Sequence, residues 1–149
     1  MVKPLSGKRI LVTRSEDQAQ IFSGKLEALG AVPLTAPVIT FQPRDEKEMY
    51  LDRLREFTWL FFTSANGVKF FFQQLHDYDI DLSVINQLHI AVVGNKTNQV
   101  LRSYGFSADF VPERFDGMDM VTKFLDTYGK EERILLISGN LARQEVANA

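Results

Sequence analysis

Small polar residues and glycines follow four short apolar runs of the sequence, and these turns are the residues best suited to bind a ligand. The four turns are Thr13-Arg14-Ser15, Thr63-Ser64-Ala65-Asn66, Gly94-Asn95-Lys96-Thr97 and Ser138-Gly139-Asn140. Three of them precede a pattern typical of a helix, and the fourth precedes the start of one. Because the first backbone N–H groups of a helix lack partners within it, they attract negative groups. The sequence therefore predicts anion binding by main-chain groups.

The clearest of these turns lies within the stretch 57–72, FTWLFFTSANGVKFFF. The run 59–62 is apolar without alternation, which is typical of a strand buried on both faces. The positions after the turn that repeat at helical spacing are Val68, Phe71, Phe72 and Leu75. Ser64 suits the N-cap position, where its hydroxyl accepts a hydrogen bond from a backbone N–H of the first helical turn. This stretch is predicted to fold as strand, tight loop and helix.

Two arginines, Arg14 and Arg143, lie at or just after predicted strand ends, where a guanidinium could bind a carboxylate through two hydrogen bonds. A solvated arginine is the simpler interpretation of each one considered singly. The same holds for each turn alone, because small and capping residues occur at strand–helix junctions in any α/β protein. The turn from Gly94 to Thr97 lacks the GxxxxGK[ST] spacing of a phosphate-binding loop.

Several other kinds of chemistry are excluded by composition. The chain of 149 residues has no cysteine, so it contains no disulfide, thiolate nucleophile or zinc–cysteine site. His76 and His89 are far apart in sequence and are interpreted as surface or strand-end residues, and no metal site is predicted. The net charge of −2 favours neither nucleic acid nor an anionic membrane as a partner. With no membrane-spanning run and no signal peptide, we expect a cytoplasmic protein.

Strand and helix patterns alternate along the chain, which predicts an α/β fold with parallel strands. The predicted strands cover 9–13, 59–62, 89–93, 108–111 and 133–137. Helices are expected after Ser15, after a possible capping box at 45–48 and after the later turns, whereas 77–87 is predicted to be a loop. The segment 31–43 carries three prolines and is predicted to be an edge strand or an extended linker between two structural units.

Taken together, the turns resemble motifs of the uroporphyrinogen-III synthase family. The segment 11–14, LVTR, resembles the start of that family, and 62–68, FTSANGV, resembles its FTS-x-x-x-V motif. The segment 91–97, AVVGNKT, is similar to its VG-x-x-T motif, with Gly105 after the next helix. The segment 136–143, LISGNLAR, is similar to its LL-x-x-GN-x-x-R turn. The order and spacing of these motifs extend the resemblance over nearly the whole chain.

The resemblance implies two α/β domains with a cleft between them, one of which is discontinuous in sequence. Residues 1–34 would be a strand–helix fragment of the discontinuous domain, and 31–43 the crossing between domains. Residues 35–149 would form most of the second domain, a three-layer, flavodoxin-like domain with a parallel sheet. The sequence ends before the family's return crossing, which carries a tyrosine thought to assist catalysis. We therefore expect a truncated form with little or no activity.

The implied substrate is hydroxymethylbilane, a linear tetrapyrrole rich in carboxylates that is closed into a ring with inversion of ring D and loss of water. No cofactor or metal is implied, and the full-length form is expected to be a monomer. No catalytic side chain is predicted. The residues predicted to bind substrate are Arg14, Ser64, Asn66, Gly94, Asn95, Thr97, Ser138, Gly139, Asn140 and Arg143.

Two alternatives stay open at this point. The chain could be a non-catalytic α/β module that uses the same helix ends to bind a phosphate or another anion. In addition, a lone strand–helix pair cannot bury its own apolar face. Residues 1–34 are therefore expected to lack order, to dock on the remaining domain, or to exchange with a second copy in a swapped dimer.

Overall fold

The computed structural model describes residues 2–42, 50–112 and 117–139. The chain divides into two compact units, Met1–Gln42 and Pro43–Ala149, and each is described by itself. The first unit consists of strand β1 (Arg9–Val12), helix α1 (Glu16–Ala28) and strand β2 (Val32–Thr35). The two strands are parallel, with Arg9 opposite Val32 and Val12 opposite Thr35. One helix covers one face of this small sheet, and the buried residues between them are Val12, Ala19, Leu26 and Ala31.

Strand β2 lies within the proline-rich segment 31–43, which the sequence predicted to be an edge strand or an extended linker, and the structure shows an edge strand at 32–35. The backbone hydrogen bonds explain why a proline-rich segment forms this strand. Val32 N donates to Lys8 O at 2.8 Å, and Ala36 N donates to Val12 O at 2.9 Å. Residues of a strand alternate between its two edges, so Pro33 and Pro37 fall where no N–H is needed for pairing with β1.

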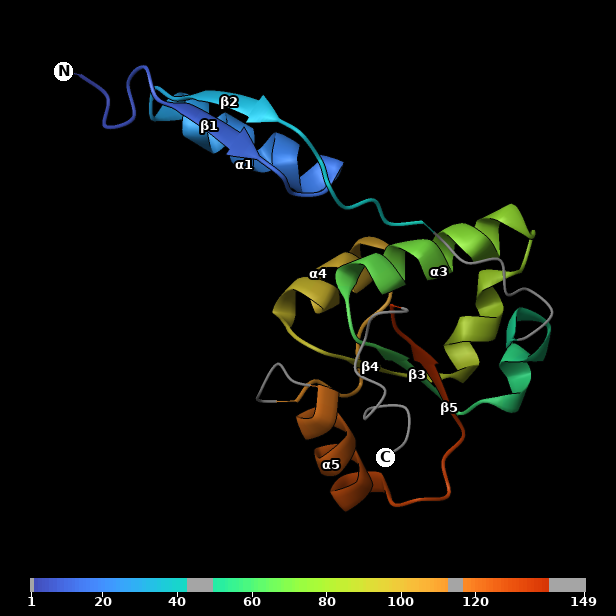
Figure 1. The fold of residues 1–149 in the computed structure, drawn as a ribbon. Helices are drawn as coiled ribbons and strands as arrows, with labels where there is room; N and C mark the ends of the chain where they lie inside the picture. Colours follow the sequence, from blue (N-terminus) through green and yellow to red (C-terminus); the bar gives the residue numbers. More distant parts are fainter. Residues whose placement is uncertain (1, 43–49, 113–116, 140–149) are drawn as a thin grey trace. The chain divides into compact units, whose positions relative to one another are not determined.

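The second unit contains a parallel sheet of strands β3 (Trp59–Phe62), β4 (His89–Val92) and β5 (Ile134–Ile137), in the order β4-β3-β5. Helices α3 (Ala65–Asp77) and α4 (Asn95–Ser103) lie on one face of this sheet, and α5 (Gly117–Tyr128) lies on the other (Figure 1). Strand β3 is central and buried at every position. The predicted α/β class with parallel strands is therefore confirmed.

Alternate residues of β3 serve two separate hydrophobic cores. Leu60 and Phe62 pack with the apolar faces of α3 and α4, as predicted for Val68, Phe71, Phe72 and Leu75, which are all buried. Trp59 and Phe61 pack on the other face with Met120 and Phe124 of α5. Burial on both faces is the reason that this strand has no polar alternation.

Three local predictions differ from the structure. Leu51–Glu56 forms a 3₁₀ helix, η1, and the predicted loop 77–87 contains a second one, η2 (Leu82–Gln87). The side chain of Asp81 begins η2 by accepting a hydrogen bond from Ser83 N, which lowers the pKa of that carboxyl group. The predicted strand 108–111 is reduced to a single bridge between Ala91 and Phe110. The possible capping box at 45–48 lies outside the described residues.

Helix ends follow the sequence more closely. The glycines that follow α1, α4 and α5 have left-handed φ values, +91° at Gly30, +87° at Gly105 and +83° at Gly129, as expected for residues that end a helix. Ser15 occupies the N-cap position of α1, but its side chain makes no capping hydrogen bond. The predicted start of this helix after Ser15 is therefore confirmed, without a capping hydrogen bond from the serine.

Candidate functional site

The carboxyl ends of β3 and β5 meet at a close backbone contact. Thr63 N and Thr63 Oγ1 both donate to the carbonyl oxygen of Ile137, at 3.3 and 3.4 Å. A Cβ atom built on Gly67 would lie 3.4 Å from both Cγ2 and O of Ile137, so the first turn of α3 packs directly against the end of β5. The turn 63–67 and the turn that begins at Ser138 are thus joined at one point.

The start of α3 is fixed by its predicted cap. Ser64 has an extended backbone, and its Oγ accepts a hydrogen bond from Gly67 N at 3.0 Å. Asn66 lies in the same first turn and is half-buried. Because Ser64 satisfies only one of the N–H groups at the helix start, the others remain available to an acceptor.

Replacing Ser64 with alanine is expected to lower the free energy of unfolding of the second unit by about 1 kcal/mol, because the Gly67 N–H loses its partner. Urea unfolding followed through Trp59, the chain's single tryptophan, measures this change. Ser103→Ala is the matched control, because Ser103 Oγ donates to Val100 O within its own helix, at an exposed position. Equal effects of the two substitutions would contradict a special role for the cap.

The strand order identifies the place in the sheet where a ligand would fit best. Along the chain, β3 is followed by β4, which lies on one side of it in the sheet, whereas the later strand β5 lies on its other side. The direction in which strands are added to the sheet therefore reverses between β3 and β5. In open α/β sheets, ligands bind in the crevice outside the carboxyl ends of the strands at such a reversal. The turn 63–67 follows β3 and the exposed pair Ser138 and Gly139 follows β5, so these two turns flank that place.

The third turn follows β4, next to β3 on the opposite side from β5. Gly94 is the N-cap of α4, with a φ of +84° that glycine adopts without strain. Asn95 and Lys96 are exposed, whereas Thr97 is only 4% exposed and contributes to the interior. Ser64 and Thr97 thus follow neighbouring parallel strands, but the Thr97 side chain is turned into the protein.

The remaining predicted residues are not brought into this group. Arg14 is exposed and belongs to the first unit. Asn140 and Arg143 lie outside the described residues. Ligand binding by any of the ten residues stays a prediction.

The feature that sequence patterns missed is the contact of Thr63 and Gly67 with Ile137, since it joins segments more than seventy residues apart.

The turns 63–67 and 138–139 carry hydroxyl, amide and backbone N–H groups and no ionisable side chain. This arrangement can hold negative groups, but it offers no general acid or base.

Among the described residues, no group of three metal-ligating side chains is present. In the same part of the chain, no helix has the length and apolar character needed to cross a membrane.

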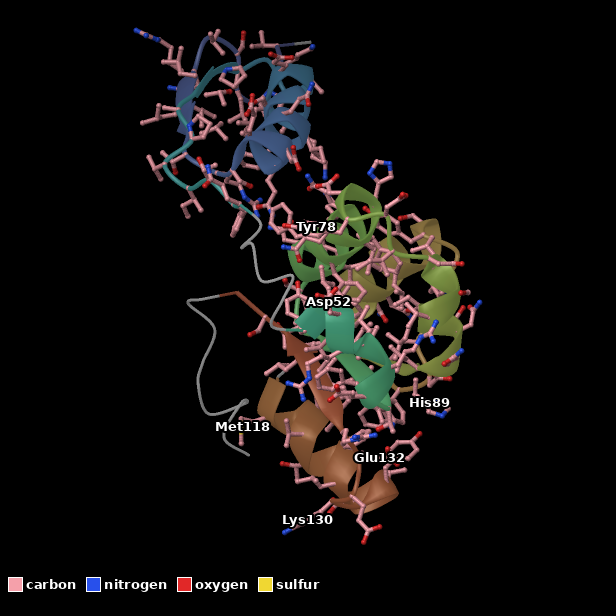
Figure 2. All side chains as sticks on the ribbon, turned by 90° about the vertical axis from the view of Figure 1, so that its right-hand side faces the viewer. Asp52, Tyr78, His89, Met118, Lys130 and Glu132 are labelled. Atoms are coloured by element: carbon pink, nitrogen blue, oxygen red, sulfur yellow. The ribbon has the colours of Figure 1, made fainter. Side chains whose placement is uncertain are left out.

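A separate polar cluster lies at the amino ends of the strands. Thr58 Oγ1 donates to Glu132 Oε2 at 2.6 Å and accepts from Arg133 N at 3.0 Å, which joins the start of β5 to β3. His89 Nδ1 lies 3.6 Å from Asp109 Oδ2. Figure 2 shows His89 and Glu132 at the same end of the unit. The interpretation of His89 as a strand-end residue is therefore confirmed.

Comparison with known proteins assigns the chain to a family. The model of the family described as "Uroporphyrinogen-III synthase HemD" matches residues 20–149. The chain belongs to this family. Ruminiclostridium josui has a "Porphyrin biosynthesis protein HemD" that is 33% identical over 151 residues, covering 99% of this chain and 30% of that protein. The "Uroporphyrinogen-III synthase" of Synechococcus elongatus is 35% identical over 128 residues, covering 82% of this chain and 47% of that protein.

Solved structures give the same assignment at the level of the fold. The crystal structure of a mutant uroporphyrinogen III synthase from the extremely thermophilic bacterium Thermus thermophilus matches with a TM-score of 0.66 and 17% sequence identity. The match covers 95% of this chain and 56% of that one. The chain therefore spans about half the length of this synthase and of the S. elongatus protein, and less of the R. josui protein.

Proposed function

We propose that this chain supplies one wall of the active-site cleft of a uroporphyrinogen-III synthase. The observation that carries the proposal is the joint position of the turns 63–67 and 138–139 at the carboxyl edge of the sheet, in a chain that belongs to this family. The substrate would be hydroxymethylbilane, whose carboxylates would accept hydrogen bonds from backbone N–H groups and from Ser64, Asn66 and Ser138.

The proposed reaction explains why the two turns need no acid or base. Hydroxymethylbilane loses its hydroxyl group as water, ring D is inverted through a spiro intermediate, and the macrocycle closes. The substrate ionises readily and also cyclises unaided to the wrong isomer. The protein's task is to hold one conformation, so orientation contributes most of the catalysis. Backbone N–H groups suit this task because they are held in place and have no protonation state to lose.

A binding experiment tests the proposal against the alternative of a phosphate-binding module. Calorimetry of the chain with uroporphyrin, as a stable polycarboxylate, is expected to give tighter binding than inorganic phosphate. The control variant Gln87→Ala lies in η2, at the amino side of β4, and should leave binding unchanged. A preference for phosphate would favour the alternative module.

An activity assay tests the role of this half-length chain. In a coupled assay that supplies hydroxymethylbilane, the 149-residue chain alone is expected to give little type III isomer, because one wall of the proposed cleft cannot enclose the substrate. The uncatalysed cyclisation measured without protein provides the baseline. Robust formation of the type III isomer by this chain alone would refute the expected loss of activity.

A further inference from the structure

The first turn of α3 contains a dipeptide that can react with itself. Asn66 is followed by Gly67, and no other asparagine of the sequence is followed by a glycine. The side-chain amide of an asparagine can be attacked by the backbone nitrogen of the next residue. Glycine hinders this attack least, because it has no side chain and adopts many backbone conformations. The dipeptide therefore combines the reactive pair of residues with a position in the turn 63–67.

The place of the dipeptide in the helix decides how well it is protected. In the interior of a helix, each backbone N–H is held by a carbonyl oxygen four residues earlier. Gly67 lies in the first turn, where no such carbonyl is available, and its N–H is held by Ser64 Oγ at 3.0 Å. A side-chain hydrogen bond thus takes the place of the main-chain bond that protects the nitrogen in a helix interior.

Packing restrains this turn less than it restrains the residues that follow. Residues 63–67 are all partly exposed, whereas Val68 is fully buried. A Cβ atom built on Gly67 would lie 3.4 Å from Ile137, so the turn touches β5 without being enclosed by it. Opening of the first turn therefore exposes little apolar surface, and its main cost is the loss of the cap from Ser64.

We propose that Asn66 is a site of spontaneous deamidation that is controlled by opening of the first turn of α3. When the turn opens, the backbone nitrogen of Gly67 loses its proton and forms a bond to Cγ of Asn66. The side-chain nitrogen takes up a proton and leaves as ammonia, and a succinimide ring remains. Water then cleaves the ring. Cleavage at Cγ yields aspartate and cleavage at the backbone carbonyl yields isoaspartate, so water is the only co-reactant.

The product changes the charge of the turn 63–67. A neutral amide becomes a carboxylate beside the backbone N–H groups at the start of α3, with which a negative group interacts favourably. The new carboxylate competes for these N–H groups with an external anion and repels it. Isoaspartate also lengthens the backbone of the turn by one carbon. Deamidation of Asn66 therefore switches off anion binding at this turn, a consequence that rests on the proposed function, whereas the deamidation itself does not.

Peptide mapping by mass spectrometry, after incubation of the folded chain at mildly alkaline pH, tests the proposal. Asn66 is expected to deamidate faster than Asn95, which is more exposed in the first turn of α4 but is followed by a lysine. Ser64→Ala should speed the reaction at Asn66 about fivefold, because the turn opens more often without its cap. Ser103→Ala is the matched control and should leave the rate unchanged, because it removes a hydroxyl from the far end of α4.

Gly67→Ala keeps the proposal testable if Ser64→Ala disturbs the fold. The added methyl group meets Ile137 at 3.4 Å, an ordinary contact distance, and it hinders the attack on Asn66, so deamidation should slow down. Circular dichroism checks that the variants keep their helix content. The proposal is overturned if Asn66 reacts no faster than Asn95, or if neither Ser64→Ala nor Gly67→Ala changes its rate.

Calorimetry with uroporphyrin tests the consequence for binding separately. Asn66→Asp, which carries the charge of the product, is expected to bind about fivefold more weakly than the unmodified chain. Asn86→Asp adds the same charge at an exposed position of η2 and should bind as the unmodified chain does. Equal binding by Asn66→Asp and the unmodified chain would overturn the switch in binding. If the unmodified chain does not bind uroporphyrin, the proposed function fails, while the deamidation rates still decide whether Asn66 is a modification site.

Discussion

Replacing Phe62 with alanine is expected to lower the free energy of unfolding of the second unit by about 3–5 kcal/mol. Phe62 is fully buried on the central strand, and its ring meets Phe71 of α3 edge-on at a centroid distance of 5.4 Å. The substitution removes this contact and leaves a cavity between the sheet and α3. An ordinary domain has a total stability of about 5–15 kcal/mol, so much of the unit's stability would be lost.

Urea unfolding monitored by circular dichroism measures the change, because α3, α4 and α5 supply most of the unit's helical signal. Phe70→Ala is the matched control. Phe70 lies on α3, the helix that packs on Phe62, but it is only partly buried, and its replacement should cost clearly less. Equal losses for Phe62→Ala and Phe70→Ala would show that the apolar side of α3 is assigned incorrectly.

Replacing Phe124 with alanine is expected to cost a similar amount, about 3–5 kcal/mol, but from the other face of the sheet. The Phe124 ring lies 4.8 Å from the rings of both Trp59 and Phe61, in edge-to-face geometry. It is 1% exposed and packs, with Met120 of the same helix, in the hydrophobic cluster that contains Trp59 and Phe61 of β3. The loss would loosen α5 and change the surroundings of the tryptophan.

Native-state fluorescence distinguishes the two substitutions. Phe124→Ala should shift the emission of Trp59 before any unfolding, because it removes a ring in contact with the indole. Phe62→Ala should leave that emission unchanged, because no ring contact between Phe62 and Trp59 is present among the described residues. Identical native spectra for Phe124→Ala and the unmodified chain would contradict the packing of α5 described above.

The strongly patterned parts of the fold were predictable from the sequence. The unbroken apolar run at 59–62 is the buried central strand, and the spacing from Val68 to Leu75 is the buried face of α3. Ser64 and the glycine after each of three helices mark helix ends correctly. These features depend on local rules of periodicity and capping, which act over a few residues and are visible in any linear sequence.

Predictions stayed open or failed where neighbours in space outweigh local patterns. The sequence left open whether 31–43 is an edge strand or a linker, and pairing with β1 makes 32–35 a strand, because Pro33 falls on the edge that needs no hydrogen bond. Residues 108–111 make only one bridge, although their pattern is extended. A sequence does not state which strand pairs with which.

The sequence by itself determined the α/β class, the positions of the main helices and the turns that resemble those of the uroporphyrinogen-III synthase family. It did so because hydrophobic periodicity and capping residues act locally. Only the tertiary structure decided that β5 lies beside β3 and that Ile137 meets Thr63 and Gly67. These facts depend on strand order and register, which are set by the packing of distant segments against one another.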